Sequence, residues 1–189
     1  KMKIIGIIPA RKGSKRLKYK NIYSLKGTPL IGYSIQAALG SKYLNTDNLY
    51  ISSNFDAIKE LADLNGIKYI IRPEHLADGT TWTQEVINHV DENVGFNSED
   101  IIVILQANSP QMTSKKIDEC IDMLINHKLW QVNPVNKDMI NNGAIQVIKR
   151  FVREHKGKVN YNGVVLTDWI DVHTIEDIRT IEQLWKDRT

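Results

Sequence analysis

The chain has 189 residues, 42% of them hydrophobic, and carries 25 lysines and arginines against 22 aspartates and glutamates. This length and apolar content exclude a disordered chain and suit one domain with a substantial buried core. Six of the cations lie within residues 11–20, which leaves 19 cations against 22 acidic residues elsewhere, a balance of −3. Because the excess positive charge is local, a nucleic-acid surface, which needs cations spread over a face, is not expected.

The expected cellular setting follows from hydropathy and cysteine content. No apolar run approaches the roughly 20 residues that span a bilayer, and the first residues do not have the apolar stretch of a signal peptide. Cys120 is the single cysteine, which agrees with a reducing compartment. We therefore predict a cytoplasmic protein without a membrane partner.

Short apolar runs alternate with helical patterns along the chain. Residues 3–8 form an apolar run that ends at Pro9, typical of a strand buried on both faces. A helix is predicted next over 28–39, with Thr28 as its N-cap and Pro29 at its first helical position. Further strands are predicted at 48–52, 68–72, 100–106, 144–149 and 163–166, and further helices at 55–66, 82–94, 114–127 and after Thr174, which caps the last.

This alternation indicates repeated βαβ units. The expected fold is therefore α/β, a doubly wound and mostly parallel sheet flanked by helices. With no internal repeat and no linker visible, residues 2–189 are predicted to form a single domain.

The segment IIPARKGSKRLKYKN, residues 7–21, leaves the carboxyl end of the first strand, where α/β sheets bind ligands. Gly13 lets the backbone approach an anion closely, Ser14 adds a hydroxyl donor, and the cations supply charge-assisted bonds that are strongest to phosphate. The spacing matches neither a P-loop nor a dinucleotide-binding motif. We therefore expect a triphosphate held mainly by side chains; the alternative is a solvated charged loop.

The pattern PARxGSKxxxxKN, residues 9–21, resembles the signature loop of the CMP-sugar synthetases, or acylneuraminate cytidylyltransferases, which are GT-A-like nucleotidyltransferases with a Rossmann-like fold. Four later segments extend the resemblance in the family's order: RPxxLA at 72–77 with Thr81 and Thr83, where the family cradles cytosine and ribose; LQANSP at 105–110; NGAI at 142–145, in the acceptor pocket; and IDV at 170–172, in the metal-binding stretch.

The resemblance implies a cytidylyltransferase that transfers CMP from CTP to an acidic sugar of sialic, legionaminic or pseudaminic type for a surface glycan. An oxygen of the acceptor attacks the α-phosphorus of CTP, and pyrophosphate leaves. Positioning and charge stabilisation dominate such phosphoryl chemistry, so cations and a metal matter more than a protein nucleophile. The resemblance further implies Mg²⁺, with Mn²⁺ as the alternative, and a homodimer.

Carried over position by position, the resemblance assigns roles to individual residues. Lys20, expected on the α-phosphate, and Arg11 are the catalytic candidates. Nucleotide binding is assigned to Ala10, Arg11, Lys12, Gly13, Ser14, Lys15, Asn21, Arg72, Thr81 and Thr83. Acceptor binding is assigned to Gln106, Asn142 and Gln146, and metal binding to Asp171 and His173.

The sequence departs from the family pattern at the metal site. His173 stands where the family usually has an aspartate, and imidazole suits Zn²⁺ or Mn²⁺ better than Mg²⁺. Three explanations are open: Asp171 works with water ligands, Asp168 or Asp177 contributes, or the metal preference has changed. His173 packing beside the last helix without a metal role is an equal alternative.

The acceptor region departs from the pattern as well. Gln146 replaces a tyrosine that packs on the sugar, so either the acceptor is smaller or more polar, or Gln146 faces solvent. The family's long dimerisation lobe is reduced or missing near 128–141. These departures keep two other functions open. The first is a CTP-dependent cytidylyltransferase that acts on a small phosphate or phosphonate, such as phosphoglutamine, to give a CDP-linked product for capsule synthesis. The second is an inactive nucleotide-binding domain.

Overall fold

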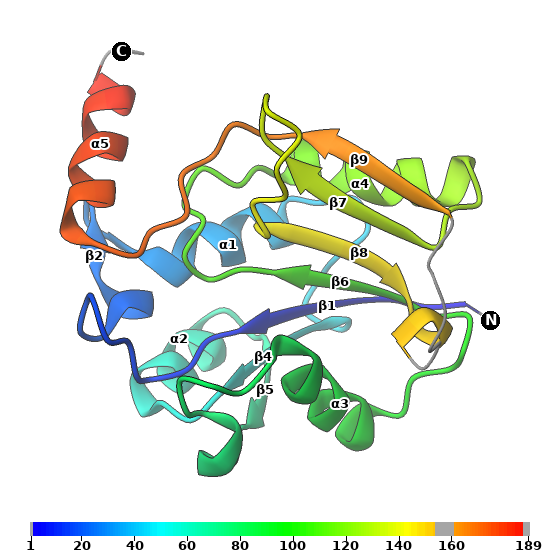
Figure 1. The fold of residues 1–189 in the computed structure, drawn as a ribbon. Helices are drawn as coiled ribbons and strands as arrows, with labels where there is room; N and C mark the ends of the chain where they lie inside the picture. Colours follow the sequence, from blue (N-terminus) through cyan, green and yellow to red (C-terminus); the bar gives the residue numbers. More distant parts are fainter. Residues whose placement is uncertain (1, 154–160, 187–189) are drawn as a thin grey trace.

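The computed structural model describes residues 2–153 and 161–186 (Figure 1). Its strands are β1 (Ile4–Pro9), β2 (Ser24–Leu25), β3 (Thr28–Pro29), β4 (Leu49–Ser53), β5 (Lys68–Ile71), β6 (Ile101–Leu105), β7 (Gln131–Val135), β8 (Ile145–Lys149) and β9 (Asn162–Leu166). Its α-helices are α1 (Leu30–Leu39), α2 (Asp56–Leu64), α3 (Thr83–Val94), α4 (Ser114–Asn126) and α5 (Ile175–Lys186), and its 3₁₀ helices are η1 (Lys20–Ile22), η2 (Glu74–Leu76) and η3 (Arg150–Arg153).

In the described ranges, seven strands form one sheet in the order β5-β4-β1-β6-β8-β7-β9. β8 runs antiparallel to both of its neighbours, whereas the β5-β4-β1-β6 part and the β7-β9 pair are parallel. Apolar cores fill both faces: α1, α2 and α4 pack on one, and α3 with η3 packs on the other. The predicted doubly wound, mostly parallel α/β fold is confirmed.

One interior strand, β7, is absent from the sequence-based prediction. It lies between β8 and β9 in the sheet and contains Pro134, opposite Val165 of β9. Proline cannot donate a hydrogen bond to a sheet and argues against an interior strand, and the polar residues of QVNPV obscure the rest of the pattern. β7 occupies part of residues 128–141, the stretch where the sequence predicts a reduced dimerisation lobe.

The predicted helix cap at Thr28 is wrong. Thr28 and Pro29 pair with Ser24 and Leu25 as a small hairpin, and α1 begins at Leu30 with Pro29 in the N-cap position and no side-chain cap. Lys26 and Gly27 both have positive φ, which two-residue hairpin turns require. The turn therefore takes Thr28 into the hairpin. At the other end of the chain, the cap by Thr174 is confirmed, because its hydroxyl accepts from the Asp177 N–H at 3.4 Å.

Burial accounts for Cys120, as the sequence predicts. The side chain is fully buried in the core beside α4 residues Ile117 and Ile121, and burial raises the pKa of its thiol to about 12. In the described ranges, no helix combines the length and apolar character needed to cross a bilayer.

Candidate active site

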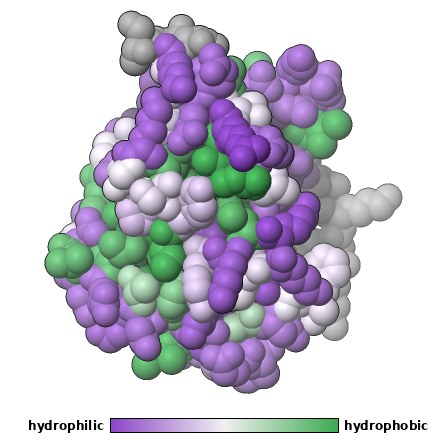
Figure 2. Space-filling model, turned by 90° about the vertical axis from the view of Figure 1, so that its left-hand side faces the viewer, coloured by the Kyte–Doolittle hydropathy of each residue, from purple (hydrophilic) through white to green (hydrophobic). Residues whose placement is uncertain are grey.

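A cleft opens at the carboxyl ends of β1, β5 and β6, the edge of the sheet that faces the viewer in Figure 2. Hydrophilic residues surround smaller apolar areas on this side of the molecule. The cleft is lined by residues that follow these strands and by the first turn of α3: Pro9, Arg11, Gly13, Ser14, Lys20, Asn21, Arg72, Leu76, Asp78, Gly79, Thr81, Thr83, Val86, Gln106, Ala107 and Asn108.

The basic loop, residues 11–20, is held against the sheet by backbone contacts. The Asn21 side chain donates to the Arg11 carbonyl oxygen at 3.0 Å, which closes the loop on itself. The Lys12 N–H donates to Asn54 Oδ1 at 2.9 Å. Tyr19 has a left-handed backbone, with φ of 53°, immediately before η1. This turn places Lys20 inside the cleft, together with Arg11.

Five of the six cations of the loop separate into two groups. Arg11 and Lys20 line the cleft, and the Lys15 side chain lies at its rim against Gly79. The Lys12 ammonium lies over the Phe55 ring at 5.4 Å, and that of Lys18 over the Tyr19 ring at 5.0 Å. Of the residues assigned to the nucleotide, Lys12, Lys15 and the fully buried Ala10 are not among those that line the cleft.

Lys20 has no carboxylate within ion-pair distance in the described part of the chain, although it lies in the field of Asp171. Burial lowers the pKa of Lys20, the charge on Asp171 opposes that shift, and Arg11 reinforces it. A half-buried cation next to a second cation favours the binding of an anion between or beside them.

Arg72 adds a buried cation from the carboxyl end of β5. The side chain is only 5% exposed, and its Nη2 donates to the Ser52 carbonyl oxygen at 2.9 Å. In the described residues no carboxylate pairs with it, and burial, followed by the charge of Arg11, lowers its pKa to about 10. Burying a cation without a carboxylate partner reduces the free energy of unfolding. The position of Arg72 is therefore better explained by binding of an anionic or acceptor-rich ligand than by a contribution to stability.

The loop before α3 forms the opposite wall of the cleft. The Asp78 carboxylate accepts from the N–H groups and hydroxyls of Thr80 and Thr81, and these bonds hold its pKa well below the usual range. Gly79 faces the basic loop, where an added Cβ would lie 3.2 Å from Lys15 Cε. No site role was assigned to Asp78 or Gly79 from the sequence, because the Asp-Gly-Thr-Thr turn signal identifies the loop but not its contact with residues 11–15.

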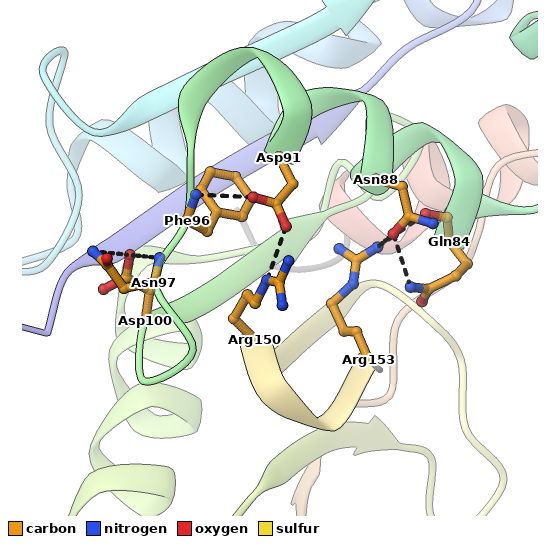
Figure 3. A network of polar contacts seen from close by, with 8 residues as sticks. All are labelled: Gln84, Asn88, Asp91, Phe96, Asn97, Asp100, Arg150 and Arg153. Carbon is orange, nitrogen blue, oxygen red and sulfur yellow. Dashed lines mark hydrogen bonds and ion pairs between the residues drawn. The ribbon is translucent and has the colours of Figure 1, made fainter. Parts of the chain in front are cut away.

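Contacts with η3 fix α3 beside the cleft (Figure 3). Arg150 Nε donates to Asp91 Oδ2 at 2.9 Å, and Arg153 Nη2 donates to the Gln84 carbonyl oxygen at 2.9 Å and to Asn88 Oδ1 at 2.6 Å. η3 directly follows β8. The network therefore joins the helix that lines the cleft to the antiparallel part of the sheet.

Three hydrogen bonds attach Asp171 and the adjacent Val172 to the segment that follows β6. Asn108 accepts from the Val172 N–H at 2.9 Å and donates to the Val172 carbonyl at 3.0 Å, and the Ser109 hydroxyl donates to Asp171 Oδ1 at 2.7 Å. Burial raises the pKa of Asp171, and Ser109, His173 and Lys20 oppose that shift. Asp171 itself does not line the cleft, but it lies close to the cleft residue Asn108 in the fold and interacts electrostatically with Lys20.

His173 Nε2 lies 3.7 Å from Asp171 Oδ2. Burial and the charge of Lys20 lower the pKa of His173, which favours the neutral imidazole that metals bind. Asp177 Oδ2 is occupied by the N–H groups of His173 and Thr174, and Asp168 lines a separate cavity with Trp169 and Trp185. Asp171 and His173 thus remain the closest candidates for a metal.

The described residues contain no group of three or more histidine, cysteine or acidic side chains that could hold a metal by themselves; His155 lies outside them. Mg²⁺ and Mn²⁺ in nucleotide sites take one or two carboxylates and complete their coordination with phosphates and water. The Asp171 carboxylate, anchored by Ser109 at the end of a cationic cleft, fits such a metal.

The three acceptor candidates differ in position. Gln106 lines the cleft. Gln146 lies on β8 opposite Ile104, so it is one strand away from Gln106 on the same face of the sheet. The side-chain amide of Asn142 donates to both oxygens of Thr167, at 3.0 and 2.7 Å, and the structure therefore gives it a role in holding the end of β9.

Replacing Arg72 with methionine should weaken the binding of CTP, the nucleotide that the sequence resemblance implies, about 10- to 100-fold, the effect of losing a charge-assisted hydrogen bond. The melting temperature should not fall, because the change removes a buried cation without a carboxylate partner. Titration calorimetry and thermal melting would measure both. Arg179, exposed on α5 and paired with Glu176, provides the matched control; a loss of stability without weaker CTP binding would give Arg72 a structural role instead.

A family model described as cytidylyltransferase matches residues 5–162. The chain is 32% identical over 124 residues to a 3-deoxy-manno-octulosonate cytidylyltransferase of Bdellovibrio bacteriovorus, a match that covers 66% of this chain and 47% of that protein. It is 33% identical over 121 residues to an N-acylneuraminate cytidylyltransferase of Escherichia coli, a match that covers 64% of this chain and 28% of that protein. The chain thus matches less than half the length of either relative.

Solved structures share the fold over nearly the whole chain. A CMP:2-keto-3-deoxy-manno-octonic acid synthetase in complex with CTP superposes with a TM-score of 0.77 at 13% identity, covering 99% of this chain and 100% of that chain. A manganese complex of a Mycobacterium tuberculosis protein gives a TM-score of 0.71 at 15% identity, covering 96% and 99%. The family match shows that the chain belongs to the cytidylyltransferase family.

Proposed function

We propose that this protein transfers CMP from CTP to an acidic sugar of sialic, legionaminic or pseudaminic type. The observation that carries the proposal is a single cleft at the carboxyl ends of the strands that contains Arg11, Lys20 and Arg72, with Asp171 in the field of Lys20. The family match and the CTP complex of a structural neighbour support CTP as the nucleotide.

In the proposed reaction an acceptor hydroxyl loses its proton to solvent, and its oxygen forms a bond to the α-phosphorus of CTP. The bond from that phosphorus to the bridging oxygen of the β-phosphate breaks, and pyrophosphate leaves with the electron pair. Lys20 stabilises the charge that develops on the α-phosphate, while Arg11, Ser14 and Asn21 hold the triphosphate. Arg72, Thr81 and Thr83 hold the nucleoside, and Gln106 and Gln146 face the acceptor.

Asp171 and His173 are proposed to hold the divalent metal beside the triphosphate. Mg²⁺ or Mn²⁺ bound there supplies positive charge to the phosphate oxygens. The anchored carboxylate is the main ligand on the protein side, and the neutral imidazole is the second. The manganese complex of a structural neighbour is compatible with Mn²⁺. A homodimer, expected from the family resemblance, is part of the proposal and can be tested by sedimentation.

Pyrophosphate release tests the proposed function. The protein would be incubated with CTP, Mg²⁺ or Mn²⁺, and a panel of N-acetylneuraminate, pseudaminate, legionaminate, 3-deoxy-manno-octulosonate and phosphoglutamine. Turnover with the acidic sugars is the expected result. Turnover with phosphoglutamine alone would establish the phosphate-acceptor alternative, and CTP binding without turnover under either metal would establish an inactive nucleotide-binding domain.

Replacing His173 with aspartate should increase the ratio of Mg²⁺-supported to Mn²⁺-supported turnover by about tenfold. A second carboxylate suits the hard Mg²⁺ ion, whereas imidazole suits Mn²⁺ better. Steady-state rates at saturating concentrations of each metal would measure the ratio for both proteins. An unchanged ratio would show that the side chain at position 173 is not a metal ligand.

A further inference from the structure

The antiparallel wing of the sheet, defined as β8, β7 and β9, has one face buried by α4 and an opposite face that is partly open. Val132, Val147 and Val165 point into the core that includes α4. Because strand side chains alternate, Asn133, Gln146 and Val164 point to the other face. Val164 is 44% exposed there, and Leu166 of the same strand is 56% exposed. In Figure 1, α4 lies behind this wing, and α3 lies nearer to the other half of the sheet.

The strand register aligns three of these side chains in a row that starts at the cleft. Gln106 follows β6, where Ile104 pairs with Gln146. Val147 pairs with Val132 in the last pair that β7 and β8 form, and Gln146 and Asn133 are the next residues of these two strands toward the cleft edge. Asn133 in turn pairs with Val164. Gln106, Gln146, Asn133 and Val164 therefore lie on or directly after successive strands, on one face of the sheet, in a row that runs outward from the cleft.

The amides in this row are available to a ligand. In the described ranges, the side-chain amides of Gln106, Gln146 and Asn133 make no hydrogen bond to the protein. The amides of Asn108 and Asn142 nearby are committed to Val172 and Thr167. Three free amides in one uncharged row can donate and accept together, which suits neutral polar groups rather than a phosphate, whose recognition calls for cations.

We propose that Asn133 is a specificity-determining residue that contacts an acylamino group of the acceptor sugar, with Gln146 beside it and Val164 in contact with the acyl methyl. The inference rests on the proposed function and deepens it. An acylamino group presents one donor, one acceptor and an apolar end, which match an amide side chain flanked by an exposed aliphatic one. A sugar with only hydroxyl groups would leave Val164 without an apolar partner.

The test compares two sugars that differ at one group: N-acetylneuraminate and its analogue with a hydroxyl in place of the acylamino group. Initial rates with saturating CTP would be measured for the wild type, Asn133→Leu and Gln131→Leu. Gln131 is the matched control, because it is an amide on the same strand and face, two residues farther from the cleft edge. Thermal melting would confirm that all three proteins are folded.

The wild type should prefer N-acetylneuraminate over the analogue by about tenfold in kcat/KM, as expected for one or two hydrogen bonds. Asn133→Leu should remove this preference by raising the KM for N-acetylneuraminate, with KM for CTP and kcat unchanged, and Gln131→Leu should retain it. An Asn133→Leu variant that keeps the wild-type preference, or a wild type that favours the hydroxyl analogue or uses only 3-deoxy-manno-octulosonate, would overturn the inference. Absence of turnover with every acidic sugar would instead refute the proposed function and remove the inference with it.

Discussion

Replacing Lys20 with alanine should lower kcat about 10²- to 10³-fold, the usual effect of removing one group that stabilises transition-state charge. The side chain lines the cleft and lies in the field of Asp171, where the α-phosphate would be held between a cation and a metal. Pyrophosphate release at saturating CTP and acceptor measures the effect. Stability should be retained, because burial disfavours the charged form of Lys20 and no described carboxylate pairs with it.

The matched control for Lys20 is Lys18→Ala in the same loop. Lys18 is exposed, and its ammonium lies over the ring of Tyr19 instead of in the cleft. This variant should keep turnover within about twofold of the wild type, because a screened surface charge contributes little. Equal losses in the two variants would mean that the loop acts through its overall charge, and an unaffected Lys20→Ala variant would contradict the role given to Lys20.

Replacing Asp171 with asparagine should also lower metal-supported turnover about 10²- to 10³-fold, because a neutral amide is a poor ligand for a hard cation. The asparagine carbonyl can still accept the Ser109 hydroxyl hydrogen bond. Burial raises the pKa of Asp171, so its charged form is disfavoured in the folded protein, and the resulting destabilisation applies above that raised pKa and vanishes below the ordinary value. The metal-free variant should therefore melt no lower than the wild type at neutral pH.

Activity and melting of the Asp171→Asn variant must be read together. Loss of turnover with an unchanged or higher melting temperature supports a metal ligand. Loss of turnover with a lower melting temperature would indicate that Asp171 mainly anchors the segment next to Asn108. Full turnover would mean that another group holds the metal, and it would contradict the site proposed above.

The sequence predicted the fold well because βαβ alternation is a local pattern. The errors arose where a tertiary contact or a turn outweighs that pattern. Pro134 argues against an interior strand, yet it pairs with Val165 of β9, and β8 pairs with Gln131 and Val132 on the other edge of β7. Thr28 has the chemistry of a helix cap, but the turn at Lys26 and Gly27 takes it into a hairpin.

In the candidate site, too, local features could be predicted from the sequence, whereas tertiary contacts could not. Charge density identified the basic loop, but charge cannot tell which way a side chain points: Arg11 and Lys20 face the cleft, whereas Lys12 turns to Phe55. Asn142 stays a predicted acceptor residue, and the sequence could not show that its amide donates to Thr167, a partner 25 residues away. The position of Asn133 depends on the register between strands, which only the folded sheet supplies.

A crystal structure with a nonhydrolysable CTP analogue and Mn²⁺ would test the central claim most directly. The account predicts a manganese anomalous signal at the Asp171 carboxylate and the triphosphate against Arg11, Ser14 and Lys20. Nucleotide bound outside this cleft, or manganese located away from Asp171, would contradict it.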